Sequence, residues 1–176
     1  MKHDQLVNLL GALSLALTDA QQQAARDVSG LGTSACAALV VLSFYPATAI
    51  ATLAPILGLT HSVVVRLSEA LVEQGLVSRA VGPVDKRQVR LSLTPAGSAK
   101  ANAILAARRR ALASALAAVP ETERDVVAAG ISAMLVGLTE SRAGADHICR
   151  MCDEAVCPGE TCPVECAAVR ITGPVA

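Results

Sequence analysis

The chain has 176 residues, a formal net charge of zero, 53% hydrophobic residues and 1% aromatic residues. This length can bury a core without disulfides, and the composition favours helices over strands. The balanced charge excludes a protein that coats nucleic acid by bulk electrostatics, so any contact with phosphate must come from a local group of basic residues.

The first twenty residues carry a lysine ahead of an apolar run, as a weak signal peptide does. Polar residues interrupt this run and its leucines recur at helical spacing, so we expect an amphipathic helix in a cytoplasmic protein. No segment has the roughly 20 uninterrupted apolar residues that span a membrane, so we expect no membrane partner. Thiols stay reduced in the cytoplasm, where clustered cysteines more often bind metal or react than form disulfides.

Apolar spacing predicts helices over about 5–26 and 34–43, and a shorter helix over about 47–57 that ends at Gly58. Thr60 can cap a further helix from His61 to Gln74, which Gly75 ends. Two helices joined by a three-residue turn form a helix-turn-helix.

Two short strands are predicted next, over 76–80 and 89–93. The connector 81–88 contains Gly, Pro and basic residues, which indicates a hairpin with an exposed basic tip. Thr94 and Pro95 start a long helix that reaches about residue 118. A last helix begins after Pro120 and is expected to close at 142–145.

These marks together resemble the MarR family of bacterial transcription regulators. The matching residues are Leu53-Ala54 and Leu57-Gly58-Leu59-Thr60 before the second helix of the motif, Leu71 and Gly75-Leu76-Val77 at its end, Asp85-Lys86-Arg87 at the hairpin tip, and Leu93-Thr94-Pro95-Ala96-Gly97 at the long helix. With the flanking helices, the resemblance covers residues 5–142.

The resemblance implies a mainly α fold in residues 1–145, in which a winged helix-turn-helix lobe with a two-stranded wing (47–94) lies between dimerisation helices (5–43 and 95–142). It implies a homodimer that binds a palindromic operator in double-stranded DNA, usually as a repressor. A small-molecule effector or cysteine oxidation would release it. Phe44 and Tyr45 are the only aromatic residues, which argues against a phenolic effector.

The same resemblance names the residues that would contact DNA. Side chains near the N-terminal end of a recognition helix reach base edges and the adjoining phosphates. The wing arginine of the family, here Arg87, enters or skirts the minor groove, with Asp85 orienting it by an ion pair. Lys86 and Arg90 would contact phosphate. The candidates are Thr60, His61, Ser62, Val63 and Arg66 on the recognition helix, with Asp85, Lys86, Arg87 and Arg90 on the wing.

Residues 146–176 hold five of the six cysteines and extend beyond the family pattern. The spacing Cys149-x2-Cys152-x4-Cys157-x4-Cys162 is that of a zinc knuckle with cysteine in place of histidine, and four thiolates can surround one zinc ion. Zinc is the first interpretation, an iron–sulfur cluster the second and metal-free redox thiols the third, with structural disulfides disfavoured. Cys166 and His147 are candidates for an additional ligand or redox group.

The sequence therefore predicts a DNA-binding transcription regulator, not an enzyme, with activity modulated by a metal or by the redox state of the tail. One alternative is a regulator that responds to a small molecule and uses the tail only as a structural zinc site. A thiol or metal-dependent enzyme is a second, but the chain shows no catalytic Ser/His/Asp or Cys/His set. A winged helix used for protein contacts is a third.

Overall fold

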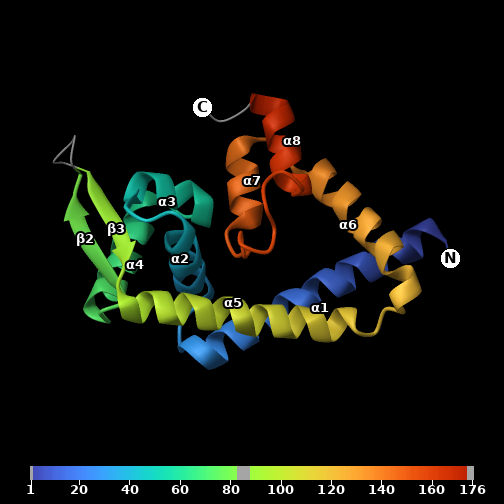
Figure 1. Cartoon of the computed structure of the whole chain (residues 1–176), viewed down its shortest axis with the longest axis horizontal. Coiled ribbons are helices and arrows are strands. Elements are labelled where there is room, and N and C mark those ends of the chain that lie inside the picture. Colours follow the sequence, from blue (N-terminus) through green and yellow to red (C-terminus); the bar gives the residue numbers. More distant parts are fainter. Residues whose placement is uncertain (1, 83–87, 174–176) are drawn as a thin grey trace.

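The computed structural model describes residues 2–82 and 88–173. Helices dominate it, and a small sheet lies at one end (Figure 1). The elements in chain order are α1 (His3–Ser29), α2 (Thr33–Phe44), β1 (Thr48–Ala49), α3 (Ile50–Leu57), α4 (His61–Glu73), β2 (Val77–Val81), β3 (Val89–Leu93), α5 (Pro95–Leu116), the 3₁₀ turn η1 (Glu121–Glu123), α6 (Arg124–Leu138), α7 (Arg142–Cys149) and α8 (Pro163–Thr172).

Helix α2 is the centre of the main core. Its eight consecutive residues 35–42 are all buried, as expected of a helix that is apolar on every side. Helices α1 and α5 lie side by side along much of their length, and α5 also packs against α2 (Figure 1). The long helices thus form a platform from which the smaller helices and the sheet project.

The predicted helix-turn-helix is confirmed. Helix α3 ends at Gly58 (φ 66°), α4 starts at His61, and Gly75 (φ 68°) follows α4 in the left-handed conformation that favours glycine. Val64 and Leu71 bury one face of α4 against the main core. The opposite face of α4 is left exposed.

The sheet contains one strand more than the sequence predicts. Strand β1 pairs antiparallel with β3, opposite the predicted β2–β3 hairpin, which gives the order β1-β3-β2. Ala47, just before β1, has φ 59°, and β3 holds it there: its N–H donates to Ser92 Oγ (3.0 Å) and its carbonyl accepts from Arg90 (3.0 Å).

The predicted start of the long helix is confirmed in its details. Thr94 Oγ1 accepts a hydrogen bond from the Gly97 N–H (3.1 Å), and Pro95 is the first residue of α5. Thr60, by contrast, is the N-cap residue of α4 but forms no side-chain capping bond, since its hydroxyl lies 3.3 Å from Ser62 Oγ instead.

The expected helix end at 142–145 is wrong. Helix α6 stops at Leu138, and a new helix, α7, starts at Arg142 because Ser141 Oγ caps it by accepting from the Gly144 N–H (3.0 Å). The domain boundary predicted after residue 145 therefore falls inside α7. Helices α6, α7 and α8 share a small second core.

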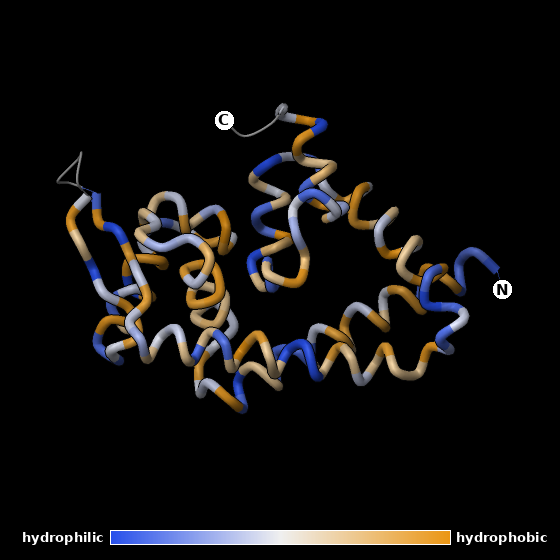
Figure 2. Tube along the Cα trace, in the orientation of Figure 1, coloured by the Kyte–Doolittle hydropathy of each residue, from blue (hydrophilic) through white to orange (hydrophobic). Residues whose placement is uncertain are grey.

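Apolar side chains remain uncovered on the arm formed by the N-terminal half of α1 and by α6. Figure 2 shows hydrophobic residues along both helices. Leu6, Leu10 and Leu13 of α1 are 45–54% exposed, and Val126 of α6 is 74% exposed. Among the described residues no single helix is long and apolar enough to cross a membrane, and only the bent pairs α1 with α2 and α3 with α4 reach that threshold when taken together.

Candidate functional site

The N-terminal end of α4 presents the predicted base-reading residues. His61, Ser62 and Arg66 are exposed, Val63 is half-buried, and Thr60 at the N-cap is exposed. The buried Val64 on the other side of the helix fixes their direction. A polar helix end fixed by its apolar side is the geometry that enters a major groove in helix-turn-helix proteins.

Only part of the predicted wing can be placed. Asp85, Lys86 and Arg87 lie outside the described residues, so their roles stay predictions. Arg90 of β3 donates to the Ala47 carbonyl, while its buried Nε has no hydrogen-bond partner. Sequence reasoning assigns Arg90 to phosphate; the structure shows that one of its nitrogens also fixes the start of β1.

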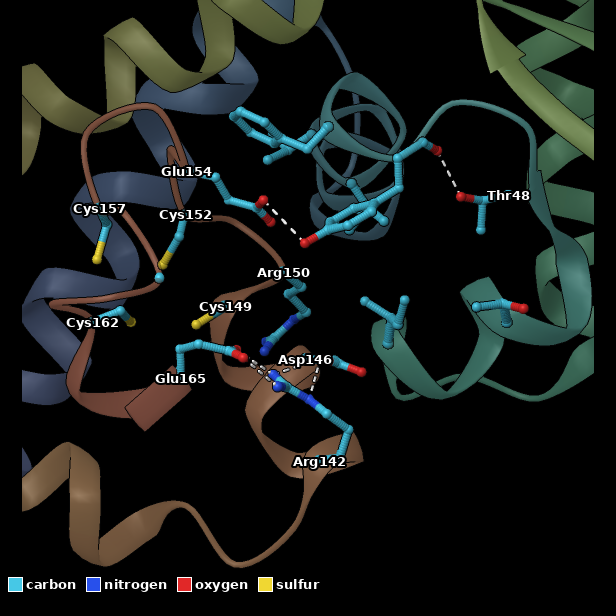
Figure 3. Close-up of a pocket in the computed structure, with 17 residues that line it drawn as sticks. Thr48, Arg142, Asp146, Cys149, Arg150, Cys152, Glu154, Cys157, Cys162 and Glu165 are labelled. Carbon is cyan, nitrogen blue, oxygen red and sulfur yellow. Dashed lines mark hydrogen bonds and ion pairs between the residues drawn. The ribbon is translucent and has the colours of Figure 1, made fainter. Parts of the chain in front are cut away.

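The four cysteines of the knuckle pattern lie around one cavity. Cys149 is the last residue of α7, Cys162 is the N-cap residue of α8, and Cys152 and Cys157 are in the loop between these helices. Figure 3 shows the four sulfur atoms turned toward a common space. All four line a cavity of about 690 Å³, the remaining walls of which come from α2, α3 and the tail itself.

The thiols influence one another electrostatically. The pKa of Cys149 is raised, first by its hydrogen bond with Cys152, then by burial and by the neighbouring thiols. The pKa of Cys152 is lowered to about 7 by the same hydrogen bond and, against the effect of burial, by the charge of Arg108. Burial, followed by a hydrogen bond with Cys162, raises the pKa of Cys157 to about 11.

All six cysteines are free thiols, and none forms a disulfide. Within residues 2–82 and 88–173, no three His, Cys, Asp or Glu side chains stand together in an arrangement that fits a single metal ion. The structure thus brings the four predicted ligands to one site, in a looser arrangement than a closed zinc tetrahedron.

The other two candidate ligands point elsewhere. Cys166 of α8 contacts the backbone carbonyls of Gly159 (3.9 Å) and Glu160 (3.5 Å) and does not line the cavity. His147 of α7 points to α3, where its Nδ1 lies 2.9 Å from the Ile56 carbonyl oxygen. Neither residue adds a donor to the cavity as it stands in the structure.

Sequence reasoning missed the residues that hold the tail in place. Arg142 forms ion pairs with Glu165 (2.8 Å) and Asp146 (3.0 Å), and the pairing with Arg142 lowers the pKa of Glu165. Tyr45 donates to Glu154 (3.0 Å), and its pKa is raised to about 12 by burial and then by this carboxylate. Tyr45 and Glu154 lie 109 positions apart and Arg142 and Glu165 lie 23 apart, so no local pattern reveals these two contacts.

Arg108 of α5 ties the thiol loop to the long helices. Its guanidinium donates to the Met151 carbonyl and to Gln21 Oε1 of α1 (2.7 Å), while Met151 packs against the main core. The half-buried guanidinium of Arg108 thus bridges α1, α5 and the loop.

Comparison with known sequences gives partial matches. No family model matches the chain. Over 76 residues it is 36% identical to an uncharacterised HTH-type transcriptional regulator of Mycobacterium bovis, a match that covers 43% of this chain and 53% of that protein. An HTH-type transcriptional regulator of Mycobacterium tuberculosis matches to the same extent. The chain therefore spans about half the length of these curated relatives.

Comparison with solved structures covers more of the chain. The YusO protein of Bacillus subtilis superposes with a TM-score of 0.64 at 25% identity, over 78% of this chain and 99% of YusO. A MarR family transcription regulator gives 0.64 at 25% identity, over 74% of this chain and 88% of its own. The chain has the winged-helix fold of the MarR-family structures. The predicted mainly α winged helix-turn-helix fold is thus confirmed.

A more distant structure shares the fold and carries DNA. A mutant of S. aureus MepR, bound to an oligodeoxyribonucleotide, superposes with a TM-score of 0.58 at 19% identity, over 76% of this chain and 97% of that one. At this identity the likeness concerns the fold alone.

Proposed function

We propose that this protein is a MarR-type transcription regulator that binds a palindromic operator in double-stranded DNA as a homodimer and represses transcription. This proposal rests on the exposed polar N-terminal end of α4, which belongs to a winged helix that superposes on MarR-family structures. The HTH-type regulators among its sequence relatives support the same class, and we expect no enzymatic activity.

A second copy of this chain is the proposed cover for the apolar arm of α1 and α6. Leaving half of each leucine side chain in contact with water costs free energy, which a partner surface would recover. The arm lies at the end of the molecule away from α4 and the sheet (Figure 1). Two arms packed together would hold two copies of α4 at a fixed separation, as a palindromic site requires.

The four-cysteine site is proposed to modulate this activity, through a bound metal or through the redox state of the thiols. Its position supports the proposal, because the cavity that it lines is also bounded by α2 and α3. The alternative is that a small molecule occupies the cavity and the thiols hold a structural zinc ion. In that case, removal of zinc should lower the stability of the tail without changing the response to the effector.

Arg66→Ala should weaken DNA binding at least tenfold, because one arginine contact to base or phosphate contributes about 1–3 kcal/mol and a dimer loses two of them. The measurement is fluorescence anisotropy on a duplex that the wild-type protein has selected from a random-sequence library. The affinity of the wild-type protein should fall linearly with salt concentration on a log–log plot.

Arg170→Ala is the matched control, since it removes the same charge from an exposed position on α8, in the tail. It should leave the affinity within about twofold of wild type. Equal losses for Arg66→Ala and Arg170→Ala would assign the effect to net charge and remove α4 as the reading helix. Failure to select any duplex would overturn the proposed function.

A further inference from the structure

A small polar pocket lies where the tail meets the long helices. Its volume is about 200 Å³, and its walls come from α1, the start of α2, α5, the end of α7 and the first residues of the thiol loop. None of its described lining residues belongs to α3, α4 or the sheet, and none is a carboxylate. The side chains that bring hydroxyl, amide or guanidinium groups to it are Thr18, Gln21, Gln22, Thr33, Arg108 and Arg150.

The two arginines of this pocket have no acidic partner in the part of the chain that the structure describes. The ion pairs found there involve neither Arg108 nor Arg150. Four carboxylates of the tail are engaged elsewhere: Asp146 and Glu165 with Arg142, Asp153 with Arg109, and Glu154 with Tyr45. Two positive charges thus line one small pocket without a carboxylate to balance them.

Both guanidinium groups keep donors for a ligand. Arg108 donates to the Met151 carbonyl and, through two nitrogens, to Gln21 Oε1, which uses three of its five N–H groups. Arg150 donates through one nitrogen to the His147 carbonyl. Burial lowers the pKa of Arg108; the Cys152 thiol opposes this effect, and the charge of Arg150 adds to it. A bound anion would stabilise two half-buried cations that repel each other.

The lining of the pocket indicates the class of ligand. Guanidinium groups bind the oxygens of carboxylates and phosphates through paired hydrogen bonds, and the hydroxyl and amide groups of threonine and glutamine can donate to further oxygens. No aromatic side chain is among the described lining residues, and the volume lies below the range of about 300–1,000 Å³ that is usual for larger organic ligands. These features favour a compact ion with two negative charges.

We propose that Arg108 and Arg150 bind a small dianion, inorganic phosphate or a short dicarboxylate, in the pocket between α1, α2, α5 and the thiol loop. The anion lies between a side chain of α5 and a side chain of the tail, so its binding fastens the tail to the long helices. Met151, the neighbour of Arg150, already packs against the main core on this side. The proposal does not rest on the proposed DNA-binding function.

The site is tested by thermal unfolding of the full-length protein in chloride buffer at constant ionic strength. Inorganic phosphate or succinate should raise Tm saturably, by about 3–6 °C at ten times its Kd. Isothermal titration calorimetry should give one anion per chain. A response to phosphate alone or to succinate alone identifies which of the two oxyanions the site takes, and the absence of saturable binding by either would overturn the proposal.

Arg150→Ala should weaken the binding of the anion at least tenfold, because it removes one of the two charges that contact it. Arg110→Ala is the matched control, since it removes the same charge from an exposed position of α5 that does not line the pocket. It should leave the Kd within about twofold of wild type. A rise in Tm that persists in Arg150→Ala would be a general salt effect, and equal losses in both variants would assign binding to net charge; either result overturns the site.

Gln22→Glu tests the charge of the pocket with the opposite sign. The new carboxylate on α1 takes the place of the anion, so the variant should melt at a higher temperature than wild type without added anion and should no longer bind phosphate or succinate. Cys152→Ser should still bind the anion, because the thiol is not one of its contacts. A lower Tm for Gln22→Glu with binding retained, or loss of binding in Cys152→Ser, would contradict the assignment to the two arginines.

Discussion

Gly97→Ala should lower the free energy of unfolding by about 3 kcal/mol or more, because the added methyl group has no space. A Cβ at Gly97 would lie 2.0 Å from the carbonyl oxygen of Leu76 and 3.0 Å from its carbonyl carbon. That oxygen is held in place, since it accepts a hydrogen bond from the Thr94 N–H (3.0 Å). Either the start of β2 or the first turn of α5 must shift, and both position the wing.

Denaturant unfolding followed by circular dichroism measures this effect. Gly130→Ala in α6 is the matched control, since nothing lies within 4 Å of a Cβ at Gly130. Alanine inside a helix is more stable than glycine by about 0.5–1 kcal/mol, so this control should unfold at slightly higher denaturant. A Gly97→Ala protein as stable as wild type would mean that α5 and β2 are not packed as the structure has them.

The winged helix could be predicted because its signals are local. Gly58, Gly75 and the pair Thr94-Pro95 each act within one turn of the chain, and the structure places all of them at element boundaries. Strand β1 could not be predicted because its two residues form a strand only by pairing with β3, more than 40 positions away. Two residues are too few to show an alternation of apolar and polar side chains. Short strands of this kind depend on tertiary contacts rather than propensity.

In the tail, too, the features with a local sequence signal could be predicted and those that depend on distant contacts could not. Cysteine spacing predicts which four thiols come together, but not the helix that carries the first of them, since the glycine in 142–145 suggests a break while Ser141 in fact caps a new helix. The contact between His147 and Ile56 joins positions 91 residues apart. Pairings of this range follow from packing, not from the local sequence.

The double substitution Leu10→Asp/Leu13→Asp should convert the proposed dimer to a monomer and abolish operator binding. Both side chains are about half exposed in the single chain and lie on the same face of α1 as Leu6. Full burial of a leucine contributes about 1.5–3 kcal/mol, so four half-exposed leucines across a two-fold interface contribute roughly 3–6 kcal/mol, and aspartates there would also be desolvated. Light scattering after size-exclusion chromatography measures the mass.

Leu15→Asp is the control that makes this prediction specific, because it places the same carboxylate on α1 but on the opposite side of the helix. Leu15 is 68% exposed, so its replacement should leave mass and DNA affinity near wild type. A monomeric double variant that still bound the selected duplex with wild-type affinity would show that one copy of α4 suffices. A palindromic site would then have no role, and the apolar arm would need a partner other than this chain.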